Sequence, residues 1–150
     1  MNVSNSKIEL VWRTRQGGGG KTYRKYLDFV IDGQSLRDIL QPGDLIGCLG
    51  WLSSQAEEQL IRQLMLRQPS QLENQSYELY ICPECGDLEC GAITVQIEKT
   101  ANNFIWKDFQ YYNGYNDPDF LQDIGPFQFN KTEYWQMLNE RLSQIIHSPG

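Results

Sequence analysis

The sequence predicts an α+β domain, with a mostly antiparallel sheet of about five strands and two main helices packed on one face. Two observations lead to this fold class. Several short runs alternate apolar and polar residues, as strands with one buried face do. Two longer segments, 54–67 and 130–146, instead repeat apolar residues with the period of a helix. The 150 residues match the size of one domain and no linker divides them, so we expect residues 1–150 to form a single domain.

The first third of the chain predicts a β-hairpin. Residues 7–15 alternate, glycines occupy 17–20, and residues 22–31 alternate again, which indicates two strands around a glycine loop. A short helix is expected over 35–40, where a Pro-Gly pair follows and ends it. Residues 45–52 are apolar but contain two glycines, and they form either a buried connection or a short strand.

Each main helix begins at a capping sequence. Ser54 and Glu57 have the spacing of a capping box, and Pro69 ends the helix that they begin. Asn130 and Glu133 have the same spacing at the start of the C-terminal helix. The predicted apolar stripe of this helix consists of Tyr134, Leu138, Leu142 and Ile145.

Three further strands are expected in the second half of the chain, over 77–81, 92–98 and 104–112. A cysteine loop, 82–91, separates the first two of them, and a long acidic and aromatic loop, 113–125, follows the third. Inward positions of the strands should supply much of the core, namely Ile8, Leu10, Trp12, Leu79, Ile81, Ile93, Val95 and Ile97.

Charge is unevenly distributed along the chain, whose formal net charge is −6. Residues 1–31 contain six basic and two acidic residues, a net +4, and the remainder contains seven basic and seventeen acidic residues, a net −10. Proteins that bind nucleic acid present a basic surface to the phosphates, so this distribution argues against a nucleic-acid partner. The basic hairpin is typical of a solvated strand face.

The chain lacks the sequence features of membrane and secreted proteins. Its mean hydropathy is −0.52. No apolar run approaches the ~20 residues of a spanning helix. The first residues do not have the pattern of a signal peptide. We therefore expect a cytoplasmic protein with no membrane partner, in a compartment where thiols are kept reduced.

Three of the four cysteines lie in the sequence CPECGDLECG, at Cys82, Cys85 and Cys90. A Cys-x-x-Cys turn directs two sulfurs to one point, which suits zinc, and the third cysteine follows five residues later. Structural zinc sites have four ligands, so the fourth would be Cys48, His147 or an acidic residue of the same loop.

Three interpretations of this loop stay open. It binds one structural zinc ion, it holds ordinary free thiols in a tight turn, or two of its cysteines cycle as a disulfide. The redox interpretation is the weakest, because the neighbouring acidic residues raise a thiol pKa and disfavour the reactive thiolate. In every case we expect the loop to be structural, with no cofactor or a single zinc ion.

Motifs for enzymatic chemistry are sparse. Gly20, Lys21 and Thr22 resemble the end of a phosphate-binding P-loop, but Arg15 occupies the place of its first glycine and a strand follows instead of a helix. His147, the single histidine, lies near the chain end, which is a poor place for a general base. We therefore expect no enzymatic activity, and a thiol oxidoreductase using the Cys-x-x-Cys pair is a less favoured alternative.

The loop over 113–125 combines aromatic and acidic residues that suit a partner-binding surface: Tyr115, Asp117, Asp119, Phe120 and Asp123. Aromatic anchors with an acidic rim fit a basic protein surface. In the alternative interpretation, Tyr115 and Phe120 fold back onto the domain. The favoured function is a non-catalytic protein-binding module of toxin-neutralising or regulatory type, and a small zinc-stapled protein is the alternative.

The second half of the chain resembles a group of small bacterial proteins. Three motifs carry the resemblance over residues 77–142: C-x-x-C-G-D-x-x-C-G in the cysteine loop, W-x-x-F at Trp106 and Phe109, and I-G-P-F-x-F from Ile124 to Phe129 before the final helix. No activity is assigned to this group, so the resemblance implies no catalytic residue. It implies a bacterial cytoplasmic protein with one intact domain.

Overall fold

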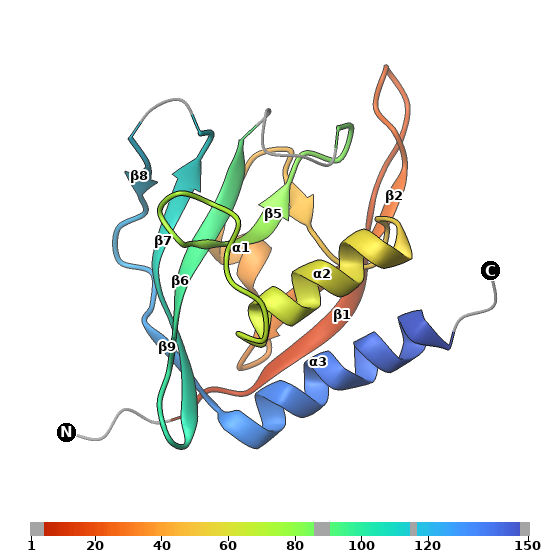
Figure 1. The fold of residues 1–150 in the computed structure, drawn as a ribbon. Helices are drawn as coiled ribbons and strands as arrows, with labels where there is room; N and C mark the ends of the chain where they lie inside the picture. Colours follow the sequence, from red (N-terminus) through yellow and green to blue (C-terminus); the bar gives the residue numbers. More distant parts are fainter. Residues whose placement is uncertain (1–4, 86–90, 115–116, 148–150) are drawn as a thin grey trace.

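The structure, a computed structural model, describes residues 5–85, 91–114 and 117–147 (Figure 1). As predicted, it is an α+β fold with mostly antiparallel strands, which form two sheets. The first sheet contains β1 (Ile8–Arg15), β2 (Arg24–Ile31) and β3 (Gln34–Ser35). The second contains β4 (Ile46–Gly47), β5 (Tyr77–Ile81), β6 (Ala92–Lys99), β7 (Asn103–Tyr112), β8 (Asp119–Phe120) and β9 (Phe127–Asn130). The helices are α1 (Leu36–Leu40), α2 (Ser54–Leu64) and α3 (Lys131–Ile146).

The single sheet of about five strands that the sequence predicts is replaced by a sheet of three strands and a sheet of six. The hairpin of β1 and β2 and the antiparallel series β5, β6 and β7 occur where they were expected. The second sheet gains β4, β8 and β9, which have two to four residues each. Strands this short contain too few residues to show alternation in the sequence.

Backbone hydrogen bonds join the two sheets at two places. The N–H of Leu27 in β2 donates to the carbonyl of Leu49, just after β4, at 2.9 Å. The N–H of Ser6, just before β1, donates to the carbonyl of Gln128 in β9 at 2.7 Å. Gly47 permits the first approach, because a Cβ atom there would collide with the carbonyl oxygen of Leu27. The strands therefore curve around one common core.

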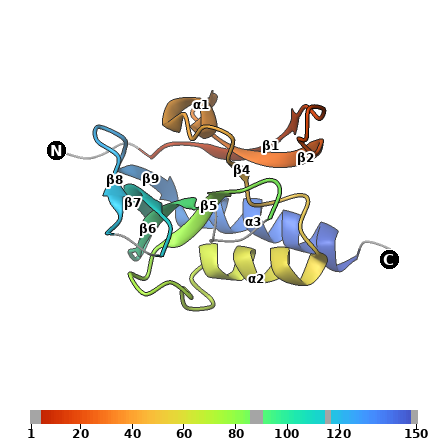
Figure 2. The ribbon, with the colours of Figure 1, turned by 90° about the horizontal axis from the view of Figure 1, so that it is seen from above.

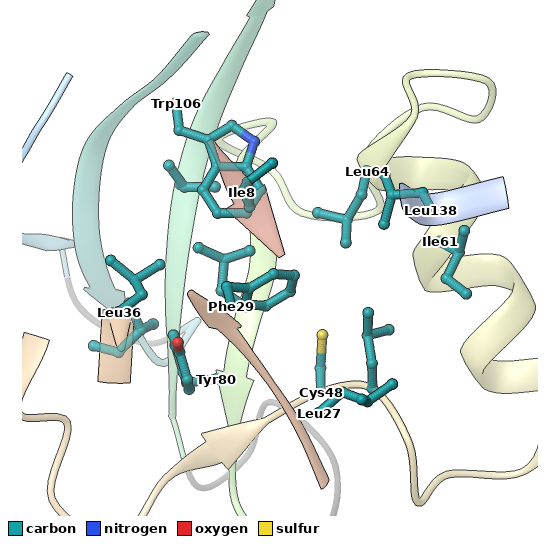
Figure 3. Packing of buried hydrophobic residues seen from close by; sticks show 14 of the residues in the cluster. Ile8, Leu27, Phe29, Leu36, Cys48, Ile61, Leu64, Tyr80, Trp106 and Leu138 are labelled. Carbon is teal, nitrogen blue, oxygen red and sulfur yellow. The ribbon is translucent and has the colours of Figure 1, made fainter. Parts of the chain in front are cut away.

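Aromatic rings form much of this core (Figure 3). Phe29 of β2 packs edge-on against Tyr80 of β5 and Trp106 of β7, with ring centroids 6.1 and 5.3 Å apart. Tyr134 of α3 stacks on Phe104 of β7 at 4.3 Å. All five side chains are buried. These contacts connect both sheets with the C-terminal helix.

Helices α2 and α3 pack against each other. The sequence predicted that both would lie on one face of one sheet, and this prediction is wrong. Figure 2 shows the β1–β2 hairpin and α2 on opposite sides of the layer that holds β5 and α3. Helix α2 contacts β5, whereas α3 contacts β1, β7 and β9 and so bridges the two sheets. Among the helices of the described residues, none is long and apolar enough to cross a membrane.

One of the two predicted helix caps is displaced by a residue. Ser53, instead of Ser54, is the N-cap of α2, and its hydroxyl accepts a hydrogen bond from the N–H of Ala56 at 3.2 Å. Asn130 caps α3 as predicted, because its side-chain oxygen accepts from the N–H of Glu133 at 3.0 Å. Two adjacent serines leave the sequence ambiguous at the first helix.

Trp12 is the predicted core residue that the structure places elsewhere. Five of the eight predicted positions are buried, Leu10 and Ile97 are half-buried, and Trp12 is 45% exposed. Its ring lies 4.8 Å from the ammonium of Lys25 and 5.4 Å from the guanidinium of Arg141. Alternation shows which residues share a face of a strand, but it does not show how far that face is covered.

Candidate functional site

The acidic and aromatic residues of the long loop lie on an edge of the six-stranded sheet, where β8 pairs with the end of β7. Phe120 is 56% exposed, and Asp117, Asp119 and Asp123 are exposed around it in the sequence. The described residues supply no ion-pair partner for these three carboxylates. We call these four residues the acidic edge. Tyr115, also predicted to belong to this surface, lies outside the described residues.

The fold fixes the direction in which Phe120 points. Phe120 pairs with Gln110 of β7, and the N–H of the next residue, Leu121, donates to the carbonyl of Phe109 at 2.8 Å. Leu121 and Ile124 are partly buried against the core. Since these two residues anchor the segment, Phe120 stays exposed instead of folding back onto the domain.

The cysteine loop is tied to the β1–β2 hairpin through Glu84. One carboxylate oxygen of Glu84 accepts hydrogen bonds from the guanidinium of Arg15 at 2.7 Å and from the N–H of Thr22 at 2.8 Å. The other accepts from the hydroxyl of Thr22 at 2.8 Å. Arg24 also donates to the carbonyl of Pro83 at 2.9 Å. The start of the loop is therefore held by residues 60 or so positions earlier in the chain, which no local pattern in the sequence indicates.

Electrostatic interactions with the hairpin favour the charged forms of two carboxylates, those of Glu84 and Asp44. The backbone N–H of Thr22, then Arg15 and the Thr22 hydroxyl, lower the pKa of Glu84 from 4.5 to about 2. A bidentate contact with Arg15, at 3.0 and 2.7 Å, lowers the pKa of Asp44. Arg15 itself is buried, so its charge is balanced by two acids instead of by water.

Among the described residues, the predicted zinc ligands do not converge on one site. Cys82 is half-buried and Cys85 is exposed, while Cys90 lies outside the described residues. Cys48 is buried in the core, where desolvation raises the pKa of its thiol and disfavours the thiolate that zinc requires. His147 is the exposed residue that ends α3. Within the described ranges, no three His, Cys, Asp or Glu side chains converge on one point. Zinc binding stays a prediction.

Sequence reasoning missed a buried polar network around Asp28 of β2, which is fully buried. Its carboxylate accepts hydrogen bonds from the hydroxyls of Tyr80 and Ser35, both at 2.5 Å, and from Arg13 at 3.2 Å. Arg13 also contacts Asp38 at 3.1 Å. The only sequence signal was an acid at an inward position of an alternating strand. Because the carboxylate is enclosed by its partners, it stabilises the fold and is not available to a ligand.

Comparison of the chain with protein-family models, with curated proteins and with solved structures gave no match. The geometry described above therefore carries the functional argument alone.

Proposed function

We propose that the protein is a cytoplasmic, non-catalytic binding module that docks a basic surface of another protein on the acidic edge. The observation that carries this proposal is Phe120, a phenylalanine that is 56% exposed on an edge strand and accompanied by three exposed aspartates. Single exposed apolar residues are ordinary, but an aromatic residue with unneutralised carboxylates beside it fits the composition of an interface anchor and its rim.

The rigidity of this segment supports the proposal. Pairing of β8 with β7 and the partial burial of Leu121 hold Phe120 in place before any partner arrives. An anchor that is already ordered loses less conformational entropy on binding than one on a loose loop. The aspartates would attract a basic partner from a distance and make the association rate fall with salt.

The placement of reactive side chains is consistent with a non-catalytic role. Cys48 and Asp28 are buried, so neither is accessible to a substrate. His147 lies at the end of α3, where its backbone N–H donates to the carbonyl of Ser143, and the described residues place no serine hydroxyl or cysteine thiol in hydrogen-bond contact with its imidazole. A general base needs such contact with the group that it activates.

Quantitative affinity capture from a bacterial lysate tests the proposal. We expect the wild-type chain to retain one or more proteins with a basic surface, and Phe120→Ala, alone or with Tyr115→Ala, to lose them. Tyr23→Ala is the matched control, because Tyr23 is an aromatic residue of similar exposure, 55%, on the β1–β2 hairpin. Equal capture by the wild type and the Phe120 variants would contradict the proposal.

A further inference from the structure

Among the residues that the structure describes, no strand lies beside one edge of β1. It is the terminal strand of the three-stranded sheet and pairs with β2 on one side only. On the other side, β9 meets the chain at Ser6, before β1 begins, and then ends at Asn130, where α3 starts. The position that a further strand would occupy beside β1 is flanked by α3 instead (Figure 1).

The backbone groups that face this open edge can be identified. The carbonyl of Lys7 accepts from the N–H of Asp32 at the β2 end, so Lys7 and alternate residues after it direct their backbone groups toward β2. The N–H of Ser6 donates in the opposite direction, toward β9. Leu10 and Trp12 have the same parity as Ser6 and therefore direct their N–H and C=O groups away from β2. Within the described part of the chain, these groups have no hydrogen-bond partner.

A groove of about 550 Å³ runs between this edge and α3. Its lining includes the consecutive residues 7–10 of the chain, so the groove follows the backbone edge of β1 and not only one face. Leu10 and Trp12 on the strand and Met137 on the helix give it an apolar part. Trp12 is 45% exposed in this groove and is therefore not part of the core, where the sequence had placed it.

The charges in the groove are predominantly acidic once their own ion pairs are considered. Lys7 pairs with Glu9 at 3.1 Å, and Arg141 makes two hydrogen bonds to the buried Glu57, at 2.7 and 3.1 Å. Glu133 and Glu140 of α3 also line the groove, and no described residue forms an ion pair with either. The remaining charge is therefore negative and lies on the helix side.

We infer that this groove binds an extended segment of a partner protein, which adds to β1 as a strand and carries both apolar and basic residues at the alternate positions that face α3. Its backbone would pair with the N–H and C=O groups of Leu10 and Trp12, as in other cases of strand addition at a sheet edge. Its apolar side chains would contact Trp12 and Met137, and its basic side chains would face Glu133 and Glu140. This surface lies apart from the acidic edge, which is on β8, and the inference does not depend on the function proposed for that edge.

Peptide binding followed by amide hydrogen exchange tests the inference. The probe is a short synthetic peptide in which every second residue, on the face toward α3, is leucine and lysine in turn, and it is compared with a peptide in which glutamate replaces each lysine. We expect the lysine peptide to bind and to slow exchange at the amides of Leu10 and Trp12, because those N–H groups gain partners. A copy of the lysine peptide with N-methyl groups on alternate amides, on the side that would face β1, should not bind, since it cannot form the ladder.

Three variants separate this groove from other acidic surfaces. Glu133→Lys with Glu140→Lys should weaken binding of the lysine peptide by about tenfold or more. Glu73→Lys, which alters an exposed acid outside the groove, and Phe120→Ala should leave it unchanged. The inference is overturned if the lysine peptide does not bind, if the glutamate or N-methylated peptide binds equally well, or if protection appears at β8 and not at Leu10 and Trp12.

Discussion

At the scale of single residues, buried polar contacts hold the two sheets in register with one another. Asp28 belongs to β2 of the first sheet and Tyr80 to β5 of the second, and their hydrogen bond crosses the core at 2.5 Å. Burial, and then the neighbouring Asp28, raise the pKa of Tyr80, so its hydroxyl remains a hydrogen-bond donor throughout the ordinary pH range. A buried carboxylate is tolerated here because each of its oxygens has a donor.

Removing the Tyr80 hydroxyl should measurably destabilise the protein. We expect Tyr80→Phe to lower the free energy of unfolding by about 2 kcal/mol, because it removes a hydrogen bond to a buried charged acceptor. Tyr77→Phe is the control on the same strand, since Tyr77 is only half-buried and makes no side-chain hydrogen bond within the described residues. Urea unfolding measures both, and equal midpoints for the two variants would show that the Asp28 contact contributes nothing.

The contact between Glu84 and the hairpin predicts a dependence of stability on pH. The folded pKa of Glu84 is about 2, below its ordinary value of 4.5, so the folded state binds this proton less readily than the unfolded state. The stabilisation is fully present above pH 4.5 and is lost as the pH falls toward 2. Asp44, whose pKa Arg15 also lowers, acts in the same direction.

We therefore expect Glu84→Gln to flatten the pH dependence of unfolding below pH 4.5, and to change the stability at neutral pH more than at acid pH. Urea midpoints measured in steps from pH 7 to pH 2.5 provide the test. Glu73→Gln, at an exposed position, is the control and should follow the wild-type curve. A wild-type slope in the Glu84 variant would mean that the contact is not maintained in solution.

At the scale of elements, the cap of α2 gives a sharp comparison between neighbouring residues. Ser53→Ala should lower the free energy of unfolding by about 1 kcal/mol, because the N–H of Ala56 loses its side-chain acceptor. Ser54→Ala should cost little, since Ser54 is the first residue inside the helix. Thermal or urea unfolding of the two variants tests this, and the reverse ranking would restore the cap that the sequence pattern favoured.

Elements with strong local patterns could be predicted from the sequence. The β1–β2 hairpin, the strands β5 to β7 and both main helices lie close to their expected positions, because alternation and capping are properties of neighbouring residues. The division into two sheets could not be predicted in this way. It depends on pairings such as that of β7 with β9 and on the bridge between Leu27 and Leu49, which join residues far apart in the sequence.

The candidate site, too, could be predicted from the sequence only in part. The composition of the long loop identified Asp117, Asp119, Phe120 and Asp123, but their exposure depends on the pairing of β8 with β7. The groove beside β1 was not predicted, because alternation assigned Trp12 to the core. Helix α3 contacts β1, β7 and β9, and its position leaves the side chain of Trp12 incompletely covered. Only the folded structure shows this.

At the scale of the whole molecule, the two proposed docking surfaces lie at different places around one core. The acidic edge is on β8, and the groove is between β1 and α3, on the other side of the ribbon in Figure 1. Both carry carboxylates that have no ion-pair partner in the described part of the chain, whose formal net charge is −6 over its full length. The electrostatic field of these negative charges speeds the approach of basic partners, and salt weakens it. We therefore expect the partners at both surfaces to be basic.

Site-specific photo-crosslinking at Phe120 tests the central claim, that the acidic edge binds a protein. A photoreactive phenylalanine analogue replaces Phe120 in one variant and Tyr23 in a second, so that two aromatic positions of similar exposure, 56% and 55%, are compared in the same cells. We expect a defined crosslinked product from position 120, containing a protein with a basic surface, and a lower yield of it when Asp119→Lys is added. No product from position 120, or the same product in equal yield from position 23, would contradict the claim.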